Sequence, residues 1–157
     1  MPDTTKLIEN LVEKYGKKRE SLLPILKGII EEERYLSEER MLEVAKALDI
    51  SGAEVYGTAS FYSFIDLKPR GKHIIRVCKT IVCDMKGKNE VIKTIKDCLG
   101  INVGETTTDG MFTLLQTNCI GQCDHAPAML IDGEVYNELN AEKVRNILKE
   151  YKLNRQN

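Results

Sequence analysis

The hydrophobic pattern of this 157-residue chain changes abruptly near residue 70. Before Lys68-Pro69-Arg70-Gly71, apolar side chains recur every three or four residues, which is the spacing of one face of an α-helix. After this segment, short runs rich in β-branched residues alternate with helical stretches. The pattern therefore predicts an α+β protein with two domains, an N-terminal helical bundle over residues 1–70 and a domain built on a small mixed sheet over residues 71–157.

The bundle is predicted from helix start and stop signals. These signals give four helices: one capped by Thr4 or Thr5 and closing at Gly16, one from about Ser21, one capped by Ser37, and one capped by Ser51 that runs to about Ala59. Each helix is near the length below which an isolated helix is unstable in water. Packing among the helices must therefore hold this part together.

The second domain is predicted from alternating runs and turn signals. Four strands are expected at His73–Lys79, Met111–Thr117, Ala128–Asp132 and Glu134–Tyr136, with helices at Asn89–Leu99 and after a cap at Asn140. The Asp132-Gly133 pair marks a hairpin turn between the last two strands. The order strand, helix, three strands, helix is typical of a small mixed sheet covered by helices, as in thioredoxin-like folds.

The composition excludes several classes of function. The formal net charge is −1, and neither domain has the basic face that a nucleic-acid-binding protein usually carries. The segment Val44–Gly57 has the look of a helix-turn-helix, but its second helix carries one acidic residue and no basic one, so we expect no nucleic-acid partner. No stretch is apolar enough to insert into a bilayer, and the first residues lack a signal-peptide pattern. We expect a cytoplasmic protein.

Five cysteines in a reducing compartment favour metal binding over disulfides. Four of them form two pairs, Cys78-x4-Cys83 and Cys119-x3-Cys123, and each pair stands where a predicted strand runs into a loop. A 2Fe-2S cluster needs four thiolates, two on each tetrahedral iron, and two pairs on facing loops supply that set. Gly121, between the members of the second pair, permits close approach of the backbone because it has no Cβ.

Other interpretations of the cysteines stay open at this point. A structural zinc site uses the same four thiolates, although its pairs more often have a spacing of two. A redox dithiol needs Cys-x-x-Cys, which is absent, and buried unligated cysteines are common in protein cores. Cys98 is expected to be such a core residue, because it lies on the apolar face of the Asn89–Leu99 helix. His73 and His125 are expected to have ordinary roles, since the pattern of a Rieske centre is missing.

With these residues identified, the sequence resembles the thioredoxin-like 2Fe-2S ferredoxin subunit of respiratory complex I and of soluble NAD-linked hydrogenases and formate dehydrogenases. The resemblance runs through nearly the whole chain. It is carried by Leu36-Ser37-Glu38-Glu39, Val55–Tyr62, Lys68-Pro69-Arg70-Gly71, the two cysteine pairs and Asp132–Tyr136. It implies that Cys78, Cys83, Cys119 and Cys123 bind one 2Fe-2S cluster, and that the chain has no substrate-converting site of its own.

The resemblance also implies the setting in which the cluster works. The chain would transfer single electrons in an NAD(P)-linked oxidoreductase, beside an NAD(P)H-binding flavoprotein subunit and a catalytic iron–sulfur subunit. FMN, NAD(P) and further iron–sulfur clusters are expected only on those partners. A soluble complex is favoured, either an iron-only hydrogenase, including the kind that bifurcates electrons, or a formate dehydrogenase. The alternatives are the peripheral arm of complex I and a free-standing ferredoxin. The helices of residues 1–70 are expected to be a docking module.

Overall fold

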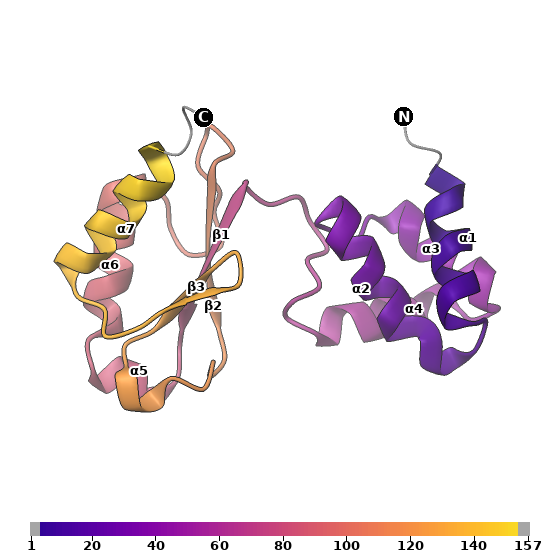
Figure 1. The fold of residues 1–157 in the computed structure, drawn as a ribbon, viewed down its shortest axis with the longest axis horizontal. Coiled ribbons are helices and arrows are strands. Elements are labelled where there is room, and N and C mark those ends of the chain that lie inside the picture. The colour runs from indigo at the N-terminus through magenta and orange to yellow at the C-terminus, as the bar shows by residue number, and fades with distance from the viewer. Residues whose placement is uncertain (1–3, 154–157) are drawn as a thin grey trace. The chain divides into compact units, whose positions relative to one another are not determined.

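A computed structural model describes residues 4–153 and divides the chain into two compact units, with the division between Pro69 and Arg70. Within residues 4–69, which we call the helical unit, the α-helices are α1 (Thr4–Tyr15), α2 (Leu22–Glu33), α3 (Glu38–Leu48) and α4 (Gly52–Phe61), with a 3-10 turn η1 at Arg19–Ser21 (Figure 1). These are the four helices that the sequence predicts.

Two of the predicted helix caps are confirmed by their hydrogen bonds. The side chain of Ser37 accepts a hydrogen bond from the backbone N–H of Arg40, and that of Ser51 accepts one from Glu54, each at 3.2 Å. Both bonds satisfy an N–H group that the first helical turn leaves without a partner. The side chains of Thr4 and Thr5, the predicted caps of α1, lie outside the described residues.

The core of the helical unit is apolar, and charged side chains, Arg40 among them, are buried beside it. Apolar side chains from all four helices are buried together, including Ile8, Val12, Ile25, Leu26, Ile29, Val44, Leu48, Val55 and Ala59. Arg40 is buried beside them, and its guanidinium donates to the carboxylates of Glu33 and Glu43. These two carboxylates raise the pKa of Arg40, so the buried charge is paired, as such charges must be.

Residues 70–153, which we call the sheet unit, contain a four-stranded mixed sheet. Its elements are β1 (His73–Cys78), α5 (Ile81–Met85), α6 (Lys88–Leu99), β2 (Phe112–Thr117), a 3-10 turn η2 (Cys123–His125), β3 (Met129–Ile131), β4 (Glu134–Tyr136) and α7 (Ala141–Leu153). The strand order is β2-β1-β3-β4, with β1 and β2 parallel and the other two pairings antiparallel. Each predicted strand end lies within one residue of the observed one.

Helices α6 and α7 lie side by side and cover one face of this sheet (Figure 1). The strands contribute Ile75, Val77, Phe112, Leu114, Met129 and Ile131 to the shared core, and the two helices contribute Val91, Ile95, Val144, Ile147 and Leu148. Asn140 caps α7, since its side chain accepts from the backbone N–H of Lys143 at 2.8 Å. The predicted thioredoxin-like sheet covered by helices is therefore confirmed.

Two short elements differ from the sequence prediction, which gave loops at these places. Cys83 lies in α5, a helix of five residues, and Cys123 opens the 3-10 turn η2. A helix this short shows no periodicity in the sequence, and the β-branched residues just before Cys83 do not favour a helix. Both cysteines are thus fixed by local helical geometry instead of by open loops.

No helix in residues 4–153 combines the length and apolar character that crossing a bilayer requires.

Candidate metal centre

The first cysteine pair is buried at the end of a strand. Cys78 is the last residue of β1, and Cys83 lies one turn further on in α5; each is only 1% exposed. The sulfur of Cys78 lies 3.2 Å from the hydroxyl oxygen of Thr80, and the side chains of Cys78 and Cys83 interact with each other. The protein thus encloses this pair of sulfur atoms.

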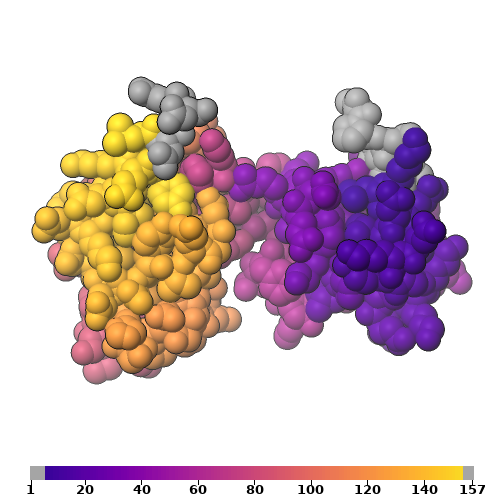
Figure 2. Space-filling view, in the orientation of Figure 1, coloured from indigo at the N-terminus to yellow at the C-terminus, as the bar shows by residue number. Residues whose placement is uncertain are grey.

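The second pair is exposed. Cys119 and Cys123 follow β2, and their sulfur atoms are 3.3 Å apart. The orange part of the chain, in which this pair lies, forms part of the surface seen in Figure 2. The backbone N–H of Gly121 donates to the sulfur of Cys119 at 3.4 Å. Gly121 has a φ of +78°, the left-handed conformation that glycine adopts without strain. The predicted close approach of this backbone to a cluster stays a prediction.

The sheet brings the two pairs to the same edge. Strands β1 and β2 run parallel as neighbours, and Cys78 stands in register with Thr117, two residues before Cys119. Their carboxyl ends therefore meet at one edge of the sheet. The thiol–thiolate interaction with Cys119, and more weakly the charges of Cys83 and Cys78, raise the pKa of Cys123. The second pair therefore lies within electrostatic reach of the first.

Hydrogen-bond donors surround the buried sulfur atoms. Burial acts to raise the pKa of Cys78, yet the balance lowers it, because the hydroxyl and N–H of Thr80 and the N–H of Ile120 stabilise the thiolate. For Cys83 burial prevails and its pKa is raised, although the N–H of Ala128 works in the other direction. The sequence favours N–H donors in these loops but does not say which residues supply them, because any backbone can offer an N–H group. It also does not identify the Thr80 hydroxyl as a donor.

The donor set fits a cluster of two irons. Each tetrahedral iron of a 2Fe-2S cluster takes two cysteine sulfurs, and the cysteines here form two local pairs with N–H and O–H donors directed at them. Within residues 4–153, no group of three or more His, Cys, Asp or Glu side chains is gathered around a single ion position. Four thiols in two pairs, with hydrogen-bond donors beside them, are the ligand types that such a cluster would require.

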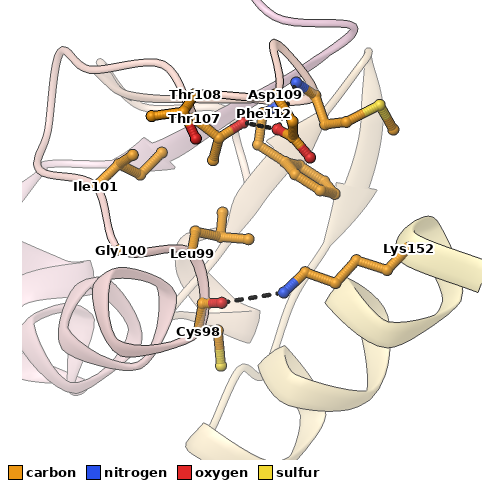
Figure 3. Close-up of a pocket in the computed structure, with 10 residues that line it drawn as sticks. Cys98, Leu99, Gly100, Ile101, Thr107, Thr108, Asp109, Phe112 and Lys152 are labelled. Atoms are coloured by element: carbon orange, nitrogen blue, oxygen red, sulfur yellow. Dashed lines mark hydrogen bonds between the residues drawn. The ribbon is translucent and has the colours of Figure 1, made fainter.

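The fifth cysteine lies elsewhere. Cys98 packs against the core of the sheet unit, as predicted. It lines a cavity of about 400 Å³ formed by the ends of α6 and α7 and by residues from the segment 100–112 (Figure 3). Lys152 donates to its backbone oxygen at 3.0 Å. None of the four paired cysteines lines this cavity.

The two histidines have carboxylate partners. The Nδ1 atom of His73 lies 2.6 Å from Asp132, and its ring packs against Phe112 and Tyr151. His125 is close to Cys123 in sequence, but its ring lies between two carboxylates. Its Nε2 atom is 3.3 Å from an oxygen of Asp124, and its Nδ1 atom is 3.2 Å from an oxygen of Glu138. Each histidine ring therefore has a carboxylate partner.

Comparison with known proteins identifies the family. The sequence pattern that defines the thioredoxin-like 2Fe-2S ferredoxins matches residues 8–152. The chain belongs to this family. The predicted cofactor, a 2Fe-2S cluster, is the one that the description of this ferredoxin family names. The match includes both units, so the helical unit is part of what these ferredoxins share and not an unrelated addition.

Relatives of this ferredoxin belong to NADH-oxidising enzymes. It is 36% identical to a subunit of the NADH-quinone oxidoreductase of Pseudomonas aeruginosa over 144 residues, which are 92% of this chain and 87% of the relative. It is 34% identical to a subunit of the NADH-quinone oxidoreductase of Thermus thermophilus over 138 residues, 87% of this chain and 76% of that one.

A solved structure extends the likeness to a hydrogenase. The ferredoxin superimposes on the crystal structure of an air-oxidised NAD+-reducing NiFe hydrogenase with a TM-score of 0.73 and 25% sequence identity. The likeness covers 85% of this chain but 23% of that chain. The counterpart of this ferredoxin is therefore one part of a much longer polypeptide.

Proposed function

We propose that this ferredoxin carries one 2Fe-2S cluster on Cys78, Cys83, Cys119 and Cys123 and transfers single electrons as a subunit of an NAD(H)-linked oxidoreductase complex. The observation that carries the proposal is the arrangement of the cysteines: two pairs, from segments about 40 residues apart in the sequence, end at one edge of the sheet in a chain of the 2Fe-2S family. When bound, the cluster supplies one-electron chemistry, so the chain itself needs no acid, base or nucleophile.

The residues of this chain bind and insulate the cluster. The buried pair, Cys78 and Cys83, would hold one iron, and the exposed pair, Cys119 and Cys123, would hold the other. The donors from Thr80, Ile120 and Ala128 offset the negative charge that builds up on buried sulfur. An exposed edge shortens the distance to a redox partner, as electron transfer between proteins requires.

Membership in an NAD(H)-linked complex is supported by the relatives. Both relatives described above are named as subunits of NADH-quinone oxidoreductases, and the solved structure is that of an NAD+-reducing hydrogenase. The partners we propose are an NAD(P)H-binding flavoprotein subunit and a catalytic iron–sulfur subunit. The finer assignment to a soluble hydrogenase, with or without electron bifurcation, or to a formate dehydrogenase, remains part of the proposal.

We further propose that the helical unit docks the ferredoxin to its complex. Aromatic side chains gather on its surface at and after α4: Phe61 is 80% exposed, and Tyr56 and Phe64 are about half exposed. The ring of Tyr62 contacts the rings of both Phe61 and Phe64. Exposed aromatic clusters are typical of protein interfaces. The longer hydrogenase chain, of which this ferredoxin matches 23%, supports permanent association with a larger protein.

Docking can be separated from cluster binding by substitution. Replacing Tyr56 and Phe61 with serine in the full chain should leave the visible spectrum of the cluster unchanged and abolish co-purification with the partner subunits. Tyr15, which is 40% exposed on α1, offers a matched control, because its replacement by serine should leave the complex intact. Retention of the complex by the double variant would refute the docking proposal.

The function itself is tested by analysis of protein purified without oxygen. We expect two irons and two acid-labile sulfides per chain, a coloured oxidised form and an EPR signal on reduction. A colourless protein with zinc and no sulfide would instead support a zinc-stabilised interaction module. The co-purifying subunits, assayed with quinone, hydrogen and formate, identify the complex. A chain that purifies alone from its host would support the free-standing ferredoxin.

A further inference from the structure

Thr80 stands at the N-cap position of α5, but its hydroxyl group does not cap this helix. Thr80 is the residue before α5 and has the extended backbone of a helix cap, with φ −71° and ψ 161°. Ser37 and Ser51 occupy the same position before α3 and α4, and both accept a hydrogen bond from the first turn. The side chain of Thr80 makes no such bond. Its hydroxyl oxygen lies 3.2 Å from the sulfur of Cys78 instead.

The direction of this hydrogen bond follows from the state of the cysteine. In a thiol, either atom can donate. An iron-bound cysteine is a thiolate without a proton, so its sulfur only accepts and the hydroxyl must donate. We propose that Thr80 is a positioning residue for the cluster: its hydroxyl donates to the Cys78 sulfur and stabilises the reduced state over the oxidised one. This inference rests on the proposed function, because it requires that Cys78 is a ligand.

The environment makes this bond effective. Cys78 is buried, and Thr80 is itself half-buried, so little water competes for the hydroxyl proton. A hydrogen bond to a charged acceptor contributes more in such surroundings than at the surface. Reduction adds negative charge to the cluster and its sulfurs, so a donor at this position favours the extra electron and raises the reduction potential.

The test compares three variants of the full-length, cluster-loaded protein by redox titration followed by EPR. Thr80→Val keeps the shape and removes the hydroxyl, whereas Thr80→Ser keeps the hydroxyl and removes the methyl group. We expect Thr80→Val to reduce the ratio of reduced to oxidised cluster at a fixed potential about tenfold, equivalent to a potential lower by about 59 mV. Thr80→Ser should stay close to the wild type. The potential of Thr80→Ala should shift in the same direction as that of Thr80→Val.

A matched control removes a hydroxyl that does not face the site. Thr94 is buried in α6 and donates to the backbone oxygen of Glu90 at 2.9 Å, so Thr94→Val should not change the potential. An unchanged potential in both Thr80→Val and Thr80→Ala would overturn the inference. A potential in Thr80→Ser that is lowered as much as in Thr80→Val would also overturn it, because packing would then be the cause. Failure of the proposed function is distinguishable, since the wild-type protein would then contain no iron or sulfide.

Discussion

The two cysteine pairs are chemically alike but lie in opposite environments. Cys78 and Cys83 are enclosed by a strand end and a short helix, whereas Cys119 and Cys123 stand exposed on a turn that a glycine keeps in a left-handed conformation. The buried pair is surrounded by donors from three segments, and the exposed sulfur of Cys119 receives an N–H from its own loop. The difference shows that one pair belongs to the folded core and the other to the surface.

The largest effect that separates the pairs should appear when one cysteine of each is changed to serine. Cys83→Ser and Cys119→Ser should both lose more than nine-tenths of the cluster. Only Cys83→Ser should also destabilise the protein without the cluster, by about 1 kcal/mol or several degrees in melting temperature, because a smaller and more strongly hydrated hydroxyl then replaces a buried sulfur. Thermal unfolding of the two metal-free variants measures this. Equal melting temperatures would mean that the buried pair plays no part in the core.

A smaller effect is expected from the glycine of the exposed turn. Gly121→Ala forces an L-residue into a left-handed conformation at a cost of about 1 kcal/mol, and should speed cluster loss to an iron chelator roughly fivefold. Gly104→Ala is the matched control, since Gly104 has a φ of +95° and equal space but lies outside both cysteine pairs. Loss of the cluster at the same rate in both variants would show that the conformation of the turn does not matter for retention.

The charges beside the two pairs should differ in their influence on the potential. Asp124 follows Cys123, and its side chain is 76% exposed. Asp84 follows Cys83 and forms an ion pair with Lys88, with 2.9 Å between the Lys88 Nζ atom and a carboxylate oxygen of Asp84. Asp124→Asn should raise the potential, on the order of tens of millivolts, because it removes a negative charge near the cluster. Asp84→Asn should raise it less, since Lys88 already offsets that charge. An unchanged or lower potential in Asp124→Asn, measured by redox titration, contradicts this electrostatic account.

The smallest effect concerns salt. An exposed carboxylate is screened as ionic strength rises, since the Debye length falls from about 30 Å at 0.01 M to about 3 Å at 1 M. The difference in potential between the wild type and Asp124→Asn should therefore shrink across this range. The difference between the wild type and Thr80→Val should persist, because the hydrogen bond is buried. Identical salt responses of the two variants would show that both residues act from equally exposed positions.

Much of the fold could be predicted from the sequence because its signals are local. The caps at Ser37, Ser51 and Asn140 and the Asp132-Gly133 turn predicted element ends within one or two residues. The sequence did not predict helix α5, because five residues are too few to display a helical period. The four candidate ligands came from the spacing of the cysteines together with the family resemblance. The particular N–H and O–H donors around these cysteines could not be predicted from the sequence. Any backbone can supply an N–H group, and only the fold decides where it points.

The sequence by itself determined the two-part pattern of helices and strands, the family and the four sulfur atoms available for a cluster, because each depends on residue type and spacing along the chain. Only the tertiary structure decided which cysteines are buried and that the Thr80 hydroxyl lies against a sulfur instead of capping α5. The physical reason is that burial and hydrogen bonding at the site arise where β1 and β2 meet, and segments about 40 residues apart become neighbours only when the sheet forms.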